Sequence, residues 1–186
     1  MSKLVRSSIQ ASGPPRVLIV QPQRTYLNML GRRIADAGYR VSTAEGVQSA
    51  VAELYRQPVD LILAELRGAA YCGRELVSLV RADSVLRDIP VLMFIGRSDT
   101  RAAVDAIRCG ADGTVKKPFH FEILIARMER ELERKRLIED LRRDKQTLDA
   151  RVIERTIAMG ELKERLAASE AELRQLQQNS RITASR

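Results

Sequence analysis

The sequence predicts an α/β fold, a doubly wound five-stranded parallel sheet, followed by a long C-terminal helix that forms a coiled coil. Five short apolar runs alternate with segments whose apolar residues repeat at helical spacing, as in parallel sheets with right-handed crossovers. Residues 59–65, Val-Asp-Leu-Ile-Leu-Ala-Glu, have the composition of a strand buried on both faces, which places them centrally in the sheet. Residues 120–178 contain no proline and one glycine, so a single helix of roughly 90 Å is possible.

Local start and stop signals delimit these elements. Pro22 closes the first strand because proline lacks the backbone donor that a strand needs, and Gly110 stands where a helix ends. Residues 67–73 have loop composition, and Ser98 or Asp99 can cap the helix after the fourth strand. In order, we expect a strand at 16–20, a helix after Pro22 that runs through Asp36, a strand at 39–43, a helix at 47–55, a strand at 59–65, a helix at 75–85, a strand at 89–95, a helix at 98–109, a strand at 113–116 and a helix from 120 onward.

The positive charge of the chain does not indicate a nucleic-acid partner. The chain of 186 residues has a formal net charge of +8, but the excess is spread out. Residues 1–118 carry 17 Lys and Arg against 11 Asp and Glu, and residues 119–186 carry 15 against 13. With no basic block and only 4% aromatic residues, a solvated surface is the better interpretation, and we expect no DNA partner.

Two further features predict a soluble, cytoplasmic protein. The two cysteines, Cys72 and Cys109, have neither zinc-site spacing nor a disulfide framework, which favours reduced thiols in the cytosol. No run of about twenty apolar residues is present, so we expect no membrane partner.

Several motifs resemble the receiver domain of bacterial two-component response regulators, the CheY-like fold. They are Gly73 after the third strand, Gly-Ala-Asp-Gly at 110–113 and Lys-Pro-Phe at 117–119. The resemblance covers residues 16–134. It implies a flavodoxin-like sheet and a cis Lys117–Pro118 peptide that turns Lys117 toward the active site.

The residues at the positions of the receiver active site depart from the family pattern. The resemblance implies an acidic pair, a phosphorylated aspartate, a hydroxyl residue, an aromatic switch residue and a lysine, with Mg²⁺ held by the carboxylates. The acidic pair corresponds to Gln21 and Pro22, the phosphorylated aspartate to Glu65 and the hydroxyl residue to Ile95. The aromatic switch residue corresponds to Thr114 and the lysine to Lys117, which is the one residue retained. We therefore expect no Mg²⁺ site, no other metal or cofactor and no enzymatic activity.

Glu65 has two interpretations. The negative charge of its carboxylate and the positive charge of the Lys117 ammonium cancel, so we expect an ion pair that closes the pocket without a metal. Glu65 then either imitates a phosphorylated aspartate or is a tolerated remnant in a domain kept for its surfaces. The remnant is favoured because Ile95 and Thr114, the positions that would sense an active state, are also changed.

A heptad pattern begins at Ile138 and predicts a coiled coil. Its a and d positions hold nine apolar residues among twelve, and Lys145, Arg155 and Ser169 interrupt the seam. A parallel homodimer is the first choice, and a lone charged helix is the alternative. The apolar seam consists of Ile138, Leu141, Leu148, Val152, Met159, Leu162, Leu166, Leu173 and Leu176.

These patterns divide the chain and suggest its function. We expect a disordered leader at 1–15, a receiver-like domain at 16–134, a coiled-coil helix at 135–178 and a flexible tail at 179–186. Residues 151–156 resemble coiled linkers before kinase or cyclase output modules, and no such module follows, so the output is lost or the chain is part of a longer protein.

Three functions are open. The leading hypothesis is a non-catalytic pseudo-receiver, an adaptor that dimerises through the coiled coil and binds a histidine kinase or another signalling protein independently of phosphorylation. The second is a phosphorelay receiver with an atypical acceptor. The third is a receiver that binds an anionic second messenger through Arg97, Arg101 and Arg108, although ordinary solvated charge is the simpler interpretation of these arginines.

Overall fold

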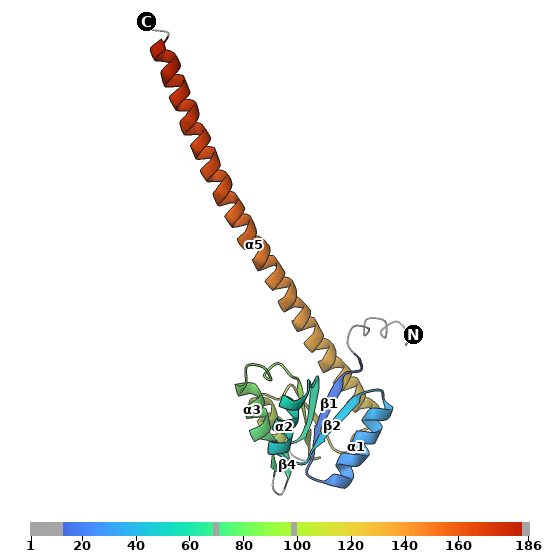
Figure 1. The fold of residues 1–186 in the computed structure, drawn as a ribbon. Helices are drawn as coiled ribbons and strands as arrows, with labels where there is room; N and C mark the ends of the chain where they lie inside the picture. The colour runs from blue at the N-terminus through green and yellow to red at the C-terminus, as the bar shows by residue number, and fades with distance from the viewer. Residues whose placement is uncertain (1–12, 69–70, 98–99, 184–186) are drawn as a thin grey trace. The chain divides into compact units, whose positions relative to one another are not determined.

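The computed structural model describes the backbone of residues 13–68, 71–97 and 100–183, and within these ranges it leaves out the side chains of 67, 68, 71, 72, 100, 170–173 and 175–183. Its elements, traced in Figure 1, are β1 (Arg16–Val20), α1 (Arg24–Asp36), β2 (Arg40–Ala44), α2 (Val47–Arg56), β3 (Leu61–Glu65), β4 (Arg67–Gly68), β5 (Tyr71–Cys72), α3 (Gly73–Ala82), β6 (Val91–Ile95), α4 (Thr100–Arg108), β7 (Gly113–Lys116) and α5 (Phe121–Thr183). The chain divides into two compact units, Met1–Leu137 and Ile138–Arg186.

The first unit contains the predicted five-stranded parallel sheet. Its strand order is β2-β1-β3-β6-β7, and all neighbouring strands are parallel. β3 lies in the middle, where Leu63 is paired with Ile19 of β1 and with Leu92 of β6. The residues of β3 from Leu61 to Ala64 are 0% exposed, which confirms the central placement of this strand.

Hydrophobic residues pack on both faces of the sheet in two clusters. One cluster contains Leu18, Ile62 and Met93, together with buried residues of α2, α3 and α4. The other contains Ile19 and Leu63, together with buried residues of α1 and of the beginning of α5. Because successive side chains of a strand point to opposite faces, α2, α3 and α4 cover one face, and α1 and α5 cover the other. This arrangement confirms the doubly wound fold.

The segment predicted as a loop over residues 67–73 is more ordered than expected. β4 and β5 pair as a short antiparallel ladder, and α3 begins at Gly73, two residues earlier than predicted. The backbone N–H of Gly73 donates to the carbonyl of Leu66 over 3.0 Å. α3 also ends early, because the carboxylate of Asp83 accepts from the N–H groups of Val85 and Leu86 and forms a competing turn.

Several other predicted boundaries differ by one or two residues. β2, β3 and β6 begin one or two residues later than predicted, at Arg40, Leu61 and Val91. The predicted helix caps Ser98 and Asp99, most of the expected leader, residues 1–12, and the side chain of Cys72 lie outside the described residues. At the end of the leader, the carbonyl oxygens of Pro14 and Pro15 accept hydrogen bonds from Arg40, which ties this part to β2.

α5 is one continuous helix with two different apolar patterns. Leu124, Met128 and Leu132 are at most 5% exposed and pack in the core of the first unit. In the second unit the side chains of Leu173 and Leu176 are not described. Seven predicted seam residues are between 38% and 69% exposed in the single chain, namely Ile138, Leu141, Leu148, Val152, Met159, Leu162 and Leu166. Among the residues that the structure describes, no helix has both the length and the hydropathy needed to cross a membrane.

Candidate functional site

Three of the predicted site residues, Gln21, Glu65 and Lys117, meet at the C-terminal edge of the sheet, where open α/β sheets bind their ligands. Gln21 directly follows β1, Glu65 is the last residue of β3, and Lys117 directly follows β7. Parallel pairing brings these strand ends together, because Val20 is in register with Ala64 and β7 pairs with the intervening strand β6. Gln21 is only 4% exposed.

Gln21, Glu65 and Lys117 form one polar cluster, the Gln21–Glu65–Lys117 cluster. The side-chain amide Nε2 of Gln21 donates to Oε2 of Glu65 over 2.9 Å. Nζ of Lys117 donates to the same oxygen and forms an ion pair with it. The ion pair predicted from the sequence is therefore present. Oε1 of Gln21 in turn accepts from the backbone N–H of Gln23 over 3.2 Å, so the cluster also holds the start of α1.

Aromatic rings surround the ammonium of Lys117. Nζ lies 4.4 Å from the ring centroid of Tyr26 and 5.4 Å from that of Phe94, distances at which cations attract aromatic rings. Phe94 also stacks on Phe119, with the centroids 5.3 Å apart. Burial, and secondarily the charge of Glu65, raises the pKa of the Tyr26 hydroxyl. The aromatic surroundings hold the lysine close to Glu65.

These aromatic contacts were missed in the sequence analysis. In the sequence, Tyr26 and Phe94 are ordinary members of apolar patterns, and Phe119 is part of the Lys-Pro-Phe motif. A signal was available, because Phe94 is next to the last residue of β6, Phe119 is two residues after Lys117, and Tyr26 lies in the first turn of the helix after β1.

The remaining predicted site residues have no role in the cluster. Pro22 has no polar side-chain atom. Ile95 is 6% exposed and belongs to a hydrophobic cluster of the sheet, where it provides no hydroxyl group. Thr114 lies in β7 opposite Met93, and its backbone carbonyl accepts a hydrogen bond from Arg127. The Lys117–Pro118 peptide bond is cis, as the resemblance implied.

The donor set does not fit Mg²⁺, the metal that the resemblance implies. Mg²⁺ prefers oxygen ligands in octahedral geometry. Oε2 of Glu65 accepts from both Gln21 and Lys117, and the amide oxygen of Gln21 is turned to the N–H of Gln23. Within the described ranges, no group of three His, Cys, Asp or Glu side chains is placed to hold a metal ion.

A groove of about 410 Å³ lies beside the cluster, between α1 and the β7–α5 connection. The guanidinium of Arg33 lies 4.3 Å from the ring centroid of Phe121 within it, and Met29 is 43% exposed. The groove therefore combines apolar walls with positive charge. Its lining residues are Tyr26, Met29, Leu30, Arg33, Lys117, Pro118, Phe119 and Phe121.

The arginines considered as an anion site lie elsewhere, after β6 and on α4. Arg97, Arg101 and Arg108 are all exposed, and none of them lines the groove beside the cluster.

Comparison with known proteins agrees with this architecture. The family model "Response regulator receiver domain" matches residues 17–129. The chain is 31% identical over 132 residues to the nitrogen assimilation regulatory protein NtrX of Azorhizobium caulinodans, covering 70% of this chain and 29% of NtrX. It is 30% identical over 118 residues to the phosphate regulon transcriptional regulatory protein PhoB of Pseudomonas aeruginosa, covering 63% of this chain and 52% of PhoB. The chain thus spans about half or less of these relatives.

Solved structures show the same fold. The chemotaxis response regulator CheY4 of Vibrio cholerae superposes with a TM-score of 0.58 at 28% identity, covering 63% of this chain and 98% of CheY4. The receiver domain of a signal transduction histidine kinase from Syntrophus aciditrophicus superposes with a TM-score of 0.59 at 28% identity, covering 64% of this chain and 90% of that one. On the family match, the sheet topology and the position of the cluster, the chain belongs to the response regulator receiver domains of two-component signalling.

Proposed function

We propose that this chain is a pseudo-receiver, a non-catalytic cytoplasmic adaptor that binds signalling partners without being phosphorylated and dimerises through α5. The observation that carries the proposal is the Gln21–Glu65–Lys117 cluster at the position of the phosphorylation site. Its one carboxylate is neutralised by the lysine and hydrogen-bonded by the amide. No metal is needed to balance charge in this arrangement.

Phosphoryl transfer to Glu65 is disfavoured for two physical reasons. Transfer needs an accessible carboxylate oxygen and a cation that neutralises the incoming phosphoryl group, and here Lys117 and Gln21 both donate to Oε2. Glutamate also places its carboxylate about 1 Å further from the backbone than aspartate, a displacement that costs a positioned reaction orders of magnitude in rate.

Intact-mass spectrometry after incubation with acetyl phosphate and Mg²⁺ tests this proposal. We expect no added phosphoryl group on the native chain, with an active receiver as the positive control. The variant Gln21→Asp/Pro22→Asp/Glu65→Asp restores the three carboxylates and serves as a matched comparison in the same fold. Stoichiometric phosphorylation of Glu65 in the native chain would instead support the atypical phosphorelay receiver.

Dimerisation is supported by the exposed apolar seam of α5. The helix is continuous from Phe121 to Thr183, and its described seam residues are largely exposed in the single chain. Exposed apolar residues that follow a heptad repeat are buried by a second helix of the same kind. A second copy of this chain offers the matching seam.

Light scattering on the full chain tests the dimer. Leu148→Glu and Leu162→Glu place charges in the seam and should convert a dimer to a monomer. Gln146→Glu changes an exposed residue outside the seam and should leave the mass unchanged. A native chain that is monomeric at micromolar concentration would remove the dimer from the proposal.

The groove beside the cluster supports the partner-binding part of the proposal. Its apolar walls and the positive charge of Arg33 suit an acidic, partly apolar surface of a histidine kinase or another signalling protein. Arg33→Glu should weaken binding of such a partner at least tenfold in interferometry, whereas Arg97→Glu, outside the groove, should not.

The same assay separates the two interpretations of Glu65. As a tolerated remnant, Glu65→Asp should leave partner affinity unchanged. As an imitation of a phosphorylated residue, it should change affinity several-fold.

A further inference from the structure

Two aspartates at the opposite, N-terminal edge of the sheet hold α5. Asp60 precedes β3, and its Oδ2 accepts from the backbone N–H of Arg16 at the start of β1 over 2.8 Å. Its other oxygen, Oδ1, lies 3.5 Å from Nζ of Lys135 on α5. Each oxygen of this carboxylate therefore serves a different element, one the beginning of a strand and the other the helix.

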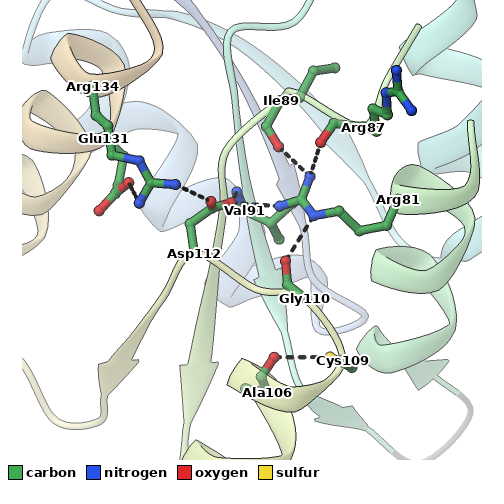
Figure 2. Close-up of polar contacts among 10 residues, drawn as sticks. All are labelled: Arg81, Arg87, Ile89, Val91, Ala106, Cys109, Gly110, Asp112, Glu131 and Arg134. Atoms are coloured by element: carbon green, nitrogen blue, oxygen red, sulfur yellow. Dashed lines mark hydrogen bonds and ion pairs between the residues drawn. The ribbon is translucent and has the colours of Figure 1, made fainter. Parts of the chain in front are cut away.

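Asp112, which precedes β7, repeats the arrangement (Figure 2). Its Oδ2 accepts from the backbone N–H of Val91 at the start of β6 over 2.8 Å, and its Oδ1 accepts from Nη2 of Arg134 over 3.1 Å. Nη1 of Arg134 is also 3.5 Å from the carboxylate of Glu131, one turn earlier on α5. Again one oxygen is bound to the beginning of a strand and the other to α5.

Arg81 of α3 makes the Asp112 side of this arrangement rigid (Figure 2). Its Nη2 donates to Oδ2 of Asp112 over 2.6 Å, and its Nε donates to the carbonyl of Gly110 over 2.8 Å. Nη1 donates to the carbonyls of Arg87 and Ile89 over 2.7 and 2.9 Å. With these four contacts, one guanidinium joins the connections before β6 and β7 and fixes the carboxylate that holds Arg134.

We propose that the pairs Asp60–Lys135 and Asp112–Arg134, together the α5 clamp, lock the rotation of α5 about its own axis at the last turn of the first unit. Arg134 and Lys135 are successive residues and leave a helix about 100° apart, so they attach it from two directions. None of residues 133–137 is buried, so beyond Leu132 these two ion pairs, which attach the helix in different directions, hold its last turn in the first unit.

The α5 clamp lies at the end of the part of α5 that belongs to the first unit. It lies just after the last buried core residue of α5, Leu132, and just before the boundary between the units at Leu137. The inference concerns contacts within the first unit and does not depend on the proposed dimer or on the loss of phosphorylation.

Hydrogen exchange on the full chain tests the lock. The Arg134→Gln/Lys135→Gln variant removes both ion pairs and retains helix-forming side chains. In this variant the amides of residues 131–137 should exchange about 2- to 20-fold faster, which is the effect expected from losing two partly exposed ion pairs. Amides of residues 121–128 should be unchanged. Arg130→Gln, which removes an exposed charge one turn earlier, is the control. Unchanged exchange at 131–137 in the double variant would overturn the proposal.

A rotation readout completes the test. Spin labels at Leu137 and at Tyr55 of α2, in a Cys72→Ser/Cys109→Ser background, should give one narrow distance distribution that widens in the double variant. An equally narrow distribution in both would refute a rotational lock. The Asp112→Asn substitution also disturbs the hydrogen bond from Arg81, so its effect alone does not isolate the Asp112–Arg134 pair. A double-mutant cycle of Asp112→Asn with Arg134→Gln isolates the coupling energy of this pair, and a coupling energy of zero counts against the clamp.

Discussion

Removing the ammonium of Lys117 should destabilise the first unit measurably. Lys117→Met keeps the aliphatic part of the side chain against Tyr26 and Phe94 but leaves the carboxylate of Glu65 with a hydrogen bond from Gln21 alone. The side chains of Glu65 and Lys117 are 14% and 30% exposed, so the pair is neither fully buried nor on the open surface.

The magnitude lies between two limits. Exposed ion pairs contribute about 0.2–1 kcal/mol, and breaking a buried pair costs about 3–5 kcal/mol. For this half-buried pair we expect a loss of about 1–3 kcal/mol in the free energy of unfolding. With a urea dependence of roughly 2 kcal/mol per molar, the midpoint should fall by about 0.5–1.5 M.

Urea denaturation followed by circular dichroism, at one protein concentration, provides the measurement. Lys116→Met, the exposed neighbour in β7, is the matched control and should change the midpoint little. Lys117→Met/Glu65→Gln removes both charges and should be about 1 kcal/mol more stable than Lys117→Met alone, because no uncompensated carboxylate remains. A double variant that loses as much as the sum of the two single variants would refute the ion-pair reasoning.

Three further outcomes follow from local geometry. Gly73→Ala should cost about 2–4 kcal/mol in urea denaturation, because a Cβ would lie 2.2 Å from the carbonyl oxygen of Glu65. Gly160→Ala should raise the helicity and thermal midpoint of the chain, since nothing lies within 4 Å of the new methyl and alanine is favoured by about 1 kcal/mol in helices. A hydrogen bond from Arg56 lowers the pKa of Glu53 from 4.5 to about 2, so its stabilisation is present above pH 4.5 and is lost as the pH falls toward 2. Glu53→Gln should therefore flatten the acid limb of a pH–stability curve, and an unaltered limb would contradict the assignment.

The fold was accessible from the sequence because its signals are local. Residues 61–64 are all apolar, and a strand with such a run is best placed at the centre of a sheet covered on both faces. Because Glu65 is the last residue of β3, it lies at the C-terminal edge of the sheet, and Lys117, which follows β7, lies at the same edge. The central strand and the Glu65–Lys117 pair were therefore predicted correctly. Local signals were weaker at 67–73, where Gly73 is required by close approach to another strand rather than by a loop.

Only the tertiary structure decided the partners of the remaining polar groups. From the sequence, Gln21 is only a residue that replaces a metal ligand of the family. In the folded protein its side-chain amide connects two elements, because Nε2 donates to Glu65 and Oε1 accepts from the N–H of Gln23 at the start of α1. The ion pair of Asp60 with Lys135 joins residues 75 positions apart. The spacing of apolar residues along the chain predicts which face of a helix is apolar, but it does not predict which part of the sheet that helix covers. The contacts that place α5 therefore arise from packing, where side chains distant in sequence meet.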